Sequence, residues 1–317
     1  MESTVRWIQQ ERGVFLRREL LDLGYDDKAI RRAVRSGAWH RVRQGAYVFA
    51  DAWHTLTPEE QYGVRGRAAL RQARTEVALS HTSALQEAGD TFWDLDLTDV
   101  HLSRTDGRSG RREAGVRQHR GLLLPGDLDQ VNGVRLTSAT RTALDISTVA
   151  DTERALVVVN ALLHDGRTTP EALQARYALM ERWPHTLGTD LVLRLADGRI
   201  ESVLESRTFF ALWRGGVPKP EPQFEIQHPS GRPLAAVDFA WPERKAFLEC
   251  DGKAKYLRLR RRDETIDEVI LREKRRQDRI CELTGWICIR VTWADLYHPE
   301  LLVARVRRTL GLDRVAW

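Results

Sequence analysis

The sequence predicts a multi-domain α/β protein of the α+β kind, with regions at 1–50, 51–195 and 200–317. Three observations predict this class. The 317 residues are enough for two or three domains at about 100–200 residues each. Hydrophobic residues make up 42% of the chain, and ten Trp, eight Phe and six Tyr supply bulky material for cores. Helical apolar stripes alternate with short apolar strands along the whole chain.

The first fifty residues have the outline of a winged helix-turn-helix. The apolar positions of residues 14–23 predict one helix, and residues 28–37 predict a second helix with Asp26 or Asp27 as its N-cap. Gly37 stops the second helix. Residues 39–49 then predict two short strands around a Gln-Gly turn.

This first region is strongly basic, since no Asp or Glu occurs between residues 28 and 43. A basic helix can enter the major groove of DNA while a basic wing contacts phosphate or the minor groove. DNA is therefore the expected partner, and the alternative is a small helical bundle used for protein contacts. The expected DNA-binding residues are Lys28, Arg31, Arg32, Arg35, Arg41, Arg43 and Gln44.

The middle region predicts a mixture of helices and strands and carries no catalytic constellation. Residues 58–88 predict two helices, and residues 137–181 are helical again. The segments 100–103 and 116–120 predict two strands joined by a Gly- and Arg-rich loop, which is interpreted as a solvated hairpin tip rather than a phosphate sensor. The histidines lack metal-ligand spacing, and structural roles are expected for His81, His101, His119 and His164.

The last 117 residues predict one domain with the element order α-β-β-β-α-β-α. A strand–helix–strand unit beside a hairpin predicts a mixed sheet with helices on both faces. The expected helices are 201–213, 263–284 and 299–310, and the expected strands are 220–229, 234–241, 246–252 and 286–293.

Carboxylates interrupt the apolar strands of this last domain. Asp238 and Glu249 stand inside strands, where an unpaired carboxylate is costly and needs a partner or a metal. A tight hairpin would place them close together, Asp251 shares the face of Glu249, and Glu205 on the preceding helix can reach the same point. Such oxygen ligands favour Mg²⁺ or Mn²⁺. The alternative is that Asp238 and Glu249 form buried salt bridges with arginines of the following helix.

Cations near these carboxylates suit a phosphodiester substrate. Lys253 can orient an attacking water or stabilise developing negative charge. The following helix offers Arg272, Arg275 and Arg276 as phosphate contacts. Together these residues predict metal-assisted hydrolysis of DNA, with RNA as an open alternative substrate.

The N-terminal half resembles a known family of regulators. Residues 13–49, GVFLRRELLDLGYDDKAIRRAVRSGAWHRVRQGAYVF, are similar to the N-terminal domain of AbiEi-type antitoxins, and VRLTSATRTALDIS (134–147) is similar to a segment that follows in them. This resemblance covers about the first 150 residues. It implies a winged-helix repressor of a type IV toxin–antitoxin operon, with a cognate toxin protein as partner.

The last domain resembles the PD-(D/E)xK nuclease superfamily, and more narrowly its Vsr-like members. The matching segments are LESR with Glu205, VDFAW with Asp238, FLECDG with Glu249, and residues 276–293. The resemblance implies a restriction-endonuclease-like fold with a metal held by Glu205, Asp238, Glu249 and Asp251. Asp251 stands where the superfamily has its lysine, so Lys253 or Gln277 would have to replace it, or the fold is kept without hydrolysis.

The hydropathy and the cysteines of the sequence indicate the cellular compartment that the protein is expected to occupy. No apolar run approaches the ~18 residues of a membrane-spanning helix, and the start of the chain has no apolar signal segment. The three cysteines lie in apolar surroundings and are expected to be thiols in a reducing cytoplasm. Two functions remain: a DNA-binding protein with a metal-dependent endonuclease tail, or a repressor and antitoxin whose nuclease-like tail is catalytically silent.

Overall fold

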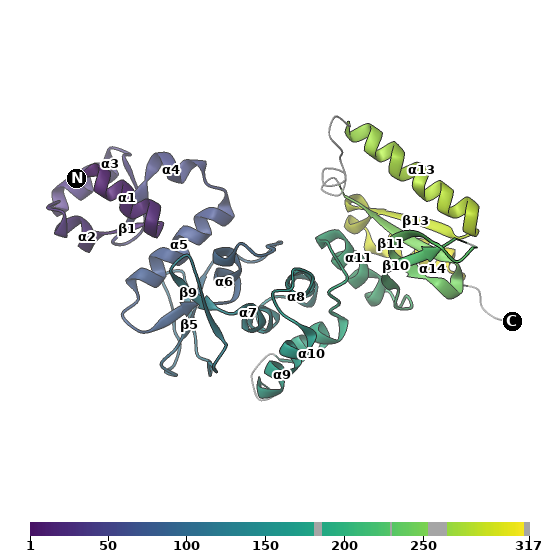
Figure 1. Ribbon diagram of the computed structural model, residues 1–317. Helices are drawn as coiled ribbons and strands as arrows, with labels where there is room; N and C mark the ends of the chain where they lie inside the picture. The colour runs from purple at the N-terminus through teal and green to yellow at the C-terminus, as the bar shows by residue number, and fades with distance from the viewer. Residues whose placement is uncertain (181–185, 229, 253–264, 314–317) are drawn as a thin grey trace. The chain divides into compact units, whose positions relative to one another are not determined.

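The structure, a computed structural model, describes residues 1–180, 186–228, 230–252 and 265–313. The chain divides into two compact units, one of residues 1–158 with 167–194 and one of residues 159–166 with 195–317. Helices and three separate sheets make up the described residues, which agrees with the predicted α/β class (Figure 1). None of the described helices combines the length and the hydropathy needed to cross a membrane.

The N-terminal region of the first unit packs four helices around a small sheet with strand order β1-β3-β2. Aromatic rings form its core, and the rings of Phe15 and Trp39 lie 5.1 Å apart, edge to face. Ile30 of the third helix is buried in the same cluster. The elements are α1 (Glu2–Arg12), β1 (Phe15–Leu16), α2 (Arg17–Asp22), α3 (Asp27–Arg35), β2 (Trp39–Arg43), β3 (Ala46–Phe49) and α4 (Ala50–Thr55).

Two sequence expectations for this region need correction. Helix α1 was not predicted, because only Val5 and Ile8 are buried in an otherwise polar segment. The helix predicted at 14–23 is divided: Phe15 and Leu16 form strand β1 against β3, and α2 begins after them. The second helix, the turn and the two strands lie where the sequence predicts them.

The rest of the first unit is built on a mixed sheet with strand order β6-β7-β5-β4-β9-β8. The hydroxyl of Tyr62 on α5 donates a hydrogen bond of 2.9 Å to the carbonyl of Asp99, next to the sheet. The elements are α5 (Pro58–Gln72), β4 (Val77–Leu79), α6 (His81–Ala88), β5 (Val100–Arg104), β6 (Arg112–Glu113), β7 (Val116–His119), β8 (Leu128–Val131), β9 (Val134–Thr137), α7 (Ala139–Ser147), α8 (Thr152–His164), α9 (Pro170–Tyr177), η1 (Ala178–Met180) and α10 (Thr186–Leu195). The last residues of α8, from Val159 on, and Leu195 of α10 belong to the second unit.

The predicted hairpin of residues 100–120 is wrong. Strand β5 pairs with β7 in parallel, with His101 opposite Arg117 and Ser103 opposite His119. The connecting loop includes the short strand β6, which pairs antiparallel with β7. The Gly- and Arg-rich loop is therefore a crossover between parallel strands, which periodicity alone does not distinguish from a hairpin.

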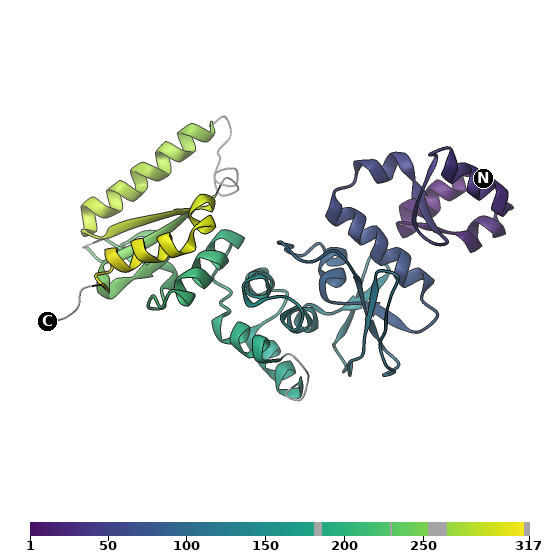
Figure 2. The same ribbon diagram turned by 180° about the vertical axis from the view of Figure 1, so that it is seen from behind.

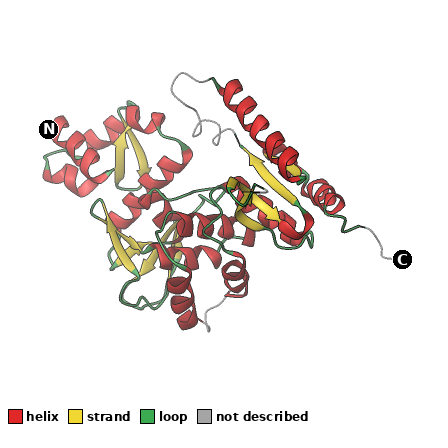
Figure 3. Ribbon diagram, turned by 45° about the vertical axis from the view of Figure 1, so that its right-hand side comes forward, coloured by secondary structure: helices red, strands yellow, loops and turns green. Residues whose placement is uncertain are grey.

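The second unit is a four-stranded mixed sheet with strand order β10-β11-β12-β13, in which only β12 and β13 are parallel. Helix α13 lies along one face, and Figure 2 shows α14 on the other side of the sheet, where α11 also packs. Figure 3 distinguishes the helices from the strands by colour. The predicted element order is observed: α11 (Val203–Arg214), β10 (Glu221–Gln227), β11 (Pro233–Trp241), η2 (Pro242–Arg244), β12 (Ala246–Asp251), α13 (Ile266–Thr284), β13 (Ile287–Thr292), η3 (Trp293–Tyr297) and α14 (Pro299–Thr309).

Candidate nucleic-acid interface and carboxylate cluster

Helix α3 presents a row of cations to solvent. The Asp26 side chain caps its start by accepting a hydrogen bond of 2.6 Å from the Ala29 amide. Ile30 is the buried anchor of the helix, and the chain turns away at Gly37, whose φ of 75° lies in the left-handed region. With Ile30 turned inward, the residues on the outer face are exposed: Lys28, Arg31, Arg32 and Arg35.

These four cations are not neutralised locally. Within the described residues, none of them has a carboxylate oxygen within 4.0 Å. The only acid within the helix, Asp27, instead binds Arg17 of α2 at 2.6 Å. Its hydrogen bond with Arg17 lowers the pKa of Asp27, and the charge of Arg31 adds a smaller effect in the same direction. The outer face of α3 is therefore free to bind a polyanion.

The β2–β3 hairpin adds further polar groups beside α3. Arg41 and Gln44 are exposed and Arg43 is half-buried. Arg41 pairs in register with Tyr47, and the ladder shifts between Arg41 and Arg43 before the turn. The Gln44 carbonyl accepts a hydrogen bond of 2.8 Å from the Gln72 side chain, which fixes the turn to α5.

A groove of about 970 Å³ begins at this turn and continues along the first unit. Six arginines and one glutamate, Glu113, are among its lining residues. Three of these arginines are paired with carboxylates: Arg17 with Asp27, Arg104 with Asp106 and Arg111 with Glu113. The sequence predicts a contact role only for Arg43 and Gln44 among these residues. Arg104 and Arg111 belong to the Gly- and Arg-rich loop, for which the sequence favours a solvated hairpin tip. Besides Arg43, the arginines that line the groove are Arg17, Arg18, Arg74, Arg104 and Arg111.

In the second unit, β11 and β12 are antiparallel, with Phe239 opposite Leu248. Asp238 and Glu249 are the next residues on the two strands, so they also lie opposite each other. Both are buried, with 7% and 1% of their surface exposed. Asp238 Oδ2 accepts a hydrogen bond of 2.6 Å from the Cys250 amide. Glu249 Oε1 accepts one of 2.7 Å from Arg276 of α13. The structure therefore places these two carboxylates side by side, as the sequence predicts.

Glu205 approaches the same sheet from α11. Its carboxylate accepts hydrogen bonds from the Glu201 amide at 3.0 Å, the Ser202 hydroxyl at 2.7 Å and the Gln223 amide at 3.3 Å. Gln223 stands between two residues that pair with Phe239 and Val237, so it lies next to Asp238 in the sheet. Gln223 thus links Glu205 to the part of the sheet that carries Asp238.

The described carboxylates do not meet as a three-carboxylate metal site. In the part of the chain that the structure describes, no three of them bring oxygen atoms within 4.8 Å of one another. The donor chemistry of Glu205, Asp238 and Glu249 suits Mg²⁺, which proteins commonly hold through one or two carboxylates together with water, so the adjacent Asp238 and Glu249 would hold such an ion. Asp251, the fourth expected ligand, is half-buried at the end of β12, where it pairs with Thr292 of β13.

The expected phosphate contacts of α13 have different surroundings. Arg276 binds Glu249 at 2.7 Å and Glu273 at 2.9 Å, so it forms a half-buried salt bridge rather than a free phosphate contact. Burial opposes its charge, but the two carboxylates outweigh burial and raise the pKa of Arg276. Arg272 lies 3.8 Å from Glu273, and Arg275 is exposed.

The two remaining residues proposed for catalysis are Gln277 and Lys253. Gln277 is buried, and its Oε1 has no hydrogen-bond partner in the described structure. Lys253 lies outside the described residues.

Helix α3 and the β2–β3 hairpin both lie within the first fifty residues. Residues 2–50 match the family described as "Transcriptional regulator, AbiEi antitoxin", so the N-terminus carries an antitoxin-type regulator domain. The match includes α3 and the β2–β3 hairpin.

Two curated relatives match a larger part of the chain. Each is described as an uncharacterized protein of Mycobacterium tuberculosis, one from strain CDC 1551 / Oshkosh and one from strain ATCC 25618 / H37Rv. Each is 29% identical to this chain over 196 residues, which is 60% of this chain and 66% of the relative. The match thus covers just under two thirds of the relatives' length.

Proposed function

We propose that this protein is a sequence-specific transcriptional regulator that binds DNA through a winged helix-turn-helix at residues 1–50. The observation that supports this most directly is the outer face of α3, where four exposed cations lack carboxylate partners in the described structure. Helix α3 would enter the major groove, with Arg31 and Arg35 one turn apart on the face that contacts it. The β2–β3 hairpin is the wing, and Arg41 contacts the phosphate backbone beside it.

The arginine-lined groove would extend this DNA surface, with Arg18, Arg43 and Arg74 as its arginines that have no carboxylate within 4.0 Å in the described structure. Arg43 and Gln44 belong both to the hairpin and to the groove, so a duplex bound at the hairpin can continue along the arginines of the first unit. Phosphate contacts of this kind supply affinity and register but little sequence information. The antitoxin-type domain also makes a cognate toxin a proposed partner, as in a type IV toxin–antitoxin system.

Purified full-length protein tests the proposal in a selection from a random duplex library, followed by fluorescence anisotropy on the selected duplex. The double variant Arg31→Ala/Arg35→Ala should bind that duplex about 30- to 1,000-fold more weakly, at roughly 1–2 kcal/mol per lost contact. The matched control is Arg194→Ala, an exposed helical arginine that pairs with Asp190. Equal affinity of wild type and double variant would overturn the proposal.

Metal-dependent cleavage of DNA by the second unit is the competing proposal. Its support is the observed element order together with the burial of Glu205, Asp238 and Glu249 near one end of a mixed sheet. The salt bridge of Glu249 with Arg276 and the absence of three converging oxygens among the described residues favour a silent tail instead.

Incubation of supercoiled plasmid with the protein and Mg²⁺, Mn²⁺ or EDTA separates the two proposals. Nicking that requires a metal and is lost in both Asp238→Asn and Glu249→Gln would establish the enzyme. We expect intact plasmid with every metal, together with normal DNA binding.

A further inference from the structure

Three histidines far apart in the sequence come together in the first unit. His81 is the first residue of α6, His101 lies in β5 and His119 ends β7. One ring nitrogen from each lies within 4.8 Å of the other two. The rings of His81 and His119 are stacked with centroids 3.8 Å apart, and His101 Nδ1 lies 2.9 Å from His119 Nε2. The parallel pairing of β5 with β7 produces this cluster, so sequence spacing gives no sign of it.

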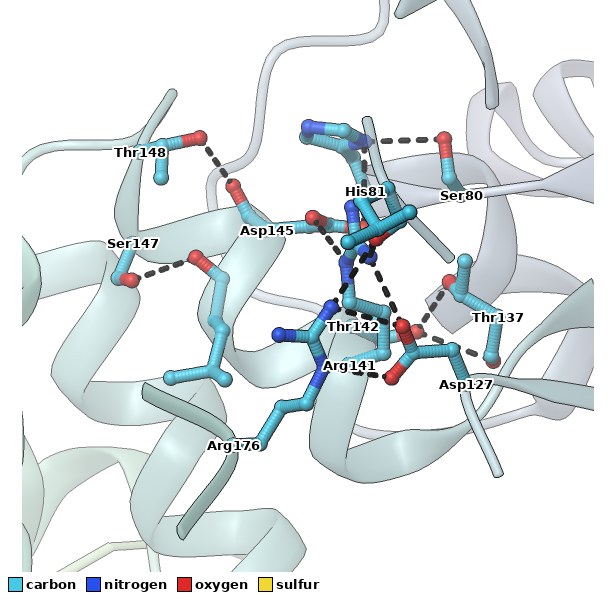
Figure 4. Close-up of polar contacts among 12 residues, drawn as sticks. Ser80, His81, Asp127, Thr137, Arg141, Thr142, Asp145, Ser147, Thr148 and Arg176 are labelled. Atoms are coloured by element: carbon cyan, nitrogen blue, oxygen red, sulfur yellow. Dashed lines mark hydrogen bonds and ion pairs between the residues drawn. The ribbon is translucent and has the colours of Figure 1, made fainter. Parts of the chain in front are cut away.

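The backbone at His81 is strained. Its φ is 52°, in the left-handed region that residues with a side chain rarely adopt. Such a conformation costs on the order of 1–3 kcal/mol and persists only where the surrounding structure enforces it. The Ser80 hydroxyl lies 2.9 Å from His81 Nδ1 and helps to hold the ring in place (Figure 4). Strained residues of this kind cluster at ligand-binding and catalytic sites.

A buried carboxylate borders the cluster. Asp145 on α7 has 2% of its side chain exposed, and its Oδ2 lies 3.8 Å from His81 Nδ1 (Figure 4). Oδ1 accepts a hydrogen bond of 2.8 Å from Arg141, whereas Oδ2 has no hydrogen-bond partner in the described structure. A second buried oxygen without such a partner, Ser103 Oγ, belongs to the residue that pairs with His119. Both atoms indicate that the site accommodates a further polar species.

The charge state of the rings suits metal coordination. Burial lowers the pKa of His101 to about 4 and that of His119 to about 3, and burial also places the pKa of His81 well below its ordinary value. The rings are therefore neutral near pH 7 and offer lone pairs. The neighbouring cation Arg141 is matched by Asp127 and Asp145, to which it is bonded.

We propose that His81, His101 and His119 bind one divalent transition-metal ion of the zinc or cobalt class, with the Asp145 carboxylate beside it. Neutral imidazole is a preferred ligand of these ions. Tetrahedral coordination with bonds of 2.0–2.1 Å puts ligand nitrogens about 3.4 Å apart. Rotations of the imidazole rings bring the present nitrogens to that spacing and unstack His81 from His119. The ion joins α6, β5 and β7, and a carboxylate near a histidine ligand is a common way to orient the ring.

Metal loading of the full-length protein tests this site. Protein stripped with EDTA is dialysed against Zn²⁺ or Co²⁺, and bound metal is measured by mass spectrometry. We expect one equivalent per chain in wild type, a rise in its thermal unfolding midpoint, and Co²⁺ absorption without a thiolate charge-transfer band. Less than about one tenth of an equivalent in wild type would overturn the proposal.

Substitutions of the histidines test which residues bind the metal. His101→Gln and His119→Gln should each lose the bound equivalent, whereas His298→Gln, an exposed histidine, should retain it. The double variant Cys281→Ser/Cys288→Ser keeps the test decisive if the histidine variants do not fold. It removes two thiols that could bind the metal in place of the histidines. Full metal content in that double variant is expected. Loss of metal there, or its retention in folded His101→Gln, would contradict the assignment.

Discussion

Helices α3 and α13 are both rich in arginine, but their arginines have different neighbours. On α3, Arg31 and Arg35 are exposed and have no carboxylate within 4.0 Å in the described structure. On α13, Arg276 bonds to two carboxylates, one of which belongs to the buried Glu249. A cation without a local partner is available to a polyanion, whereas a paired one contributes to the fold. The number of basic residues on a helix is therefore a weaker indication of DNA binding than whether those residues are already paired with carboxylates.

The largest effect on stability is expected for an arginine that is completely paired and buried. Arg141 is 1% exposed and bonds to Asp127 at 3.1 Å and to Asp145 at 2.8 Å. Arg141→Ala should lower the free energy of unfolding by about 3–5 kcal/mol in urea titrations, since buried carboxylates lose their partner. The control is Arg154, whose side chain is 38% exposed and which pairs with the exposed Asp94 and Asp151. Arg154→Ala should cost about 1 kcal/mol or less. Equal costs for the two would contradict the account.

An intermediate effect is expected at the half-buried pair of α13. Arg276→Ala should lower the free energy of unfolding by about 2 kcal/mol, less than a completely buried pair because Arg276 is partly exposed. DNA affinity measured on the same sample should stay within threefold of wild type. The control is Arg279→Ala on the same helix, which should change little. A large loss of DNA affinity with unchanged stability would show that α13 contacts DNA.

A smaller effect is expected at the cap of α3. Asp26→Ala removes the side chain that accepts from the Ala29 amide and should cost about 1 kcal/mol, while Asp26→Ser should restore most of it. Fraying of the first turn should also weaken DNA binding severalfold, as measured by anisotropy. Asp22→Ala, an exposed acid at the end of α2, is the matched control. A cap variant with normal stability and weakened DNA binding would mean that Asp26 acts on DNA directly.

The smallest effect on stability is expected for the α3 double variant, which should have the largest effect on DNA binding. Arg31→Ala/Arg35→Ala should leave the free energy of unfolding within about 0.5 kcal/mol of wild type, because exposed side chains without partners contribute little. Calorimetric unfolding of the two proteins side by side measures this. A large loss of stability would place these arginines in the fold rather than at an interface.

Much of this structure could be predicted from the sequence where local signals are strong. The cap at Asp26 and the glycine at 37 delimit α3, and the alternation of apolar runs predicts all four strands of the second unit. What the sequence could not predict depends on pairing between distant segments. The parallel alignment of β5 with β7 brings His101 to His119, and the bond of Arg276 to Glu249 joins α13 to β12.

The central claim is that the outer face of α3 is the DNA-binding surface, and the salt dependence of binding tests it most directly. The logarithm of the binding constant should fall linearly with the logarithm of salt concentration, with a slope of about −0.9 for each phosphate contacted. Arg31→Ala/Arg35→Ala should weaken binding about 30- to 1,000-fold, and the size of the slope should fall by about 1 for each of the two arginines that contacts a phosphate. The same slope and the same affinity in wild type and variant would contradict the claim.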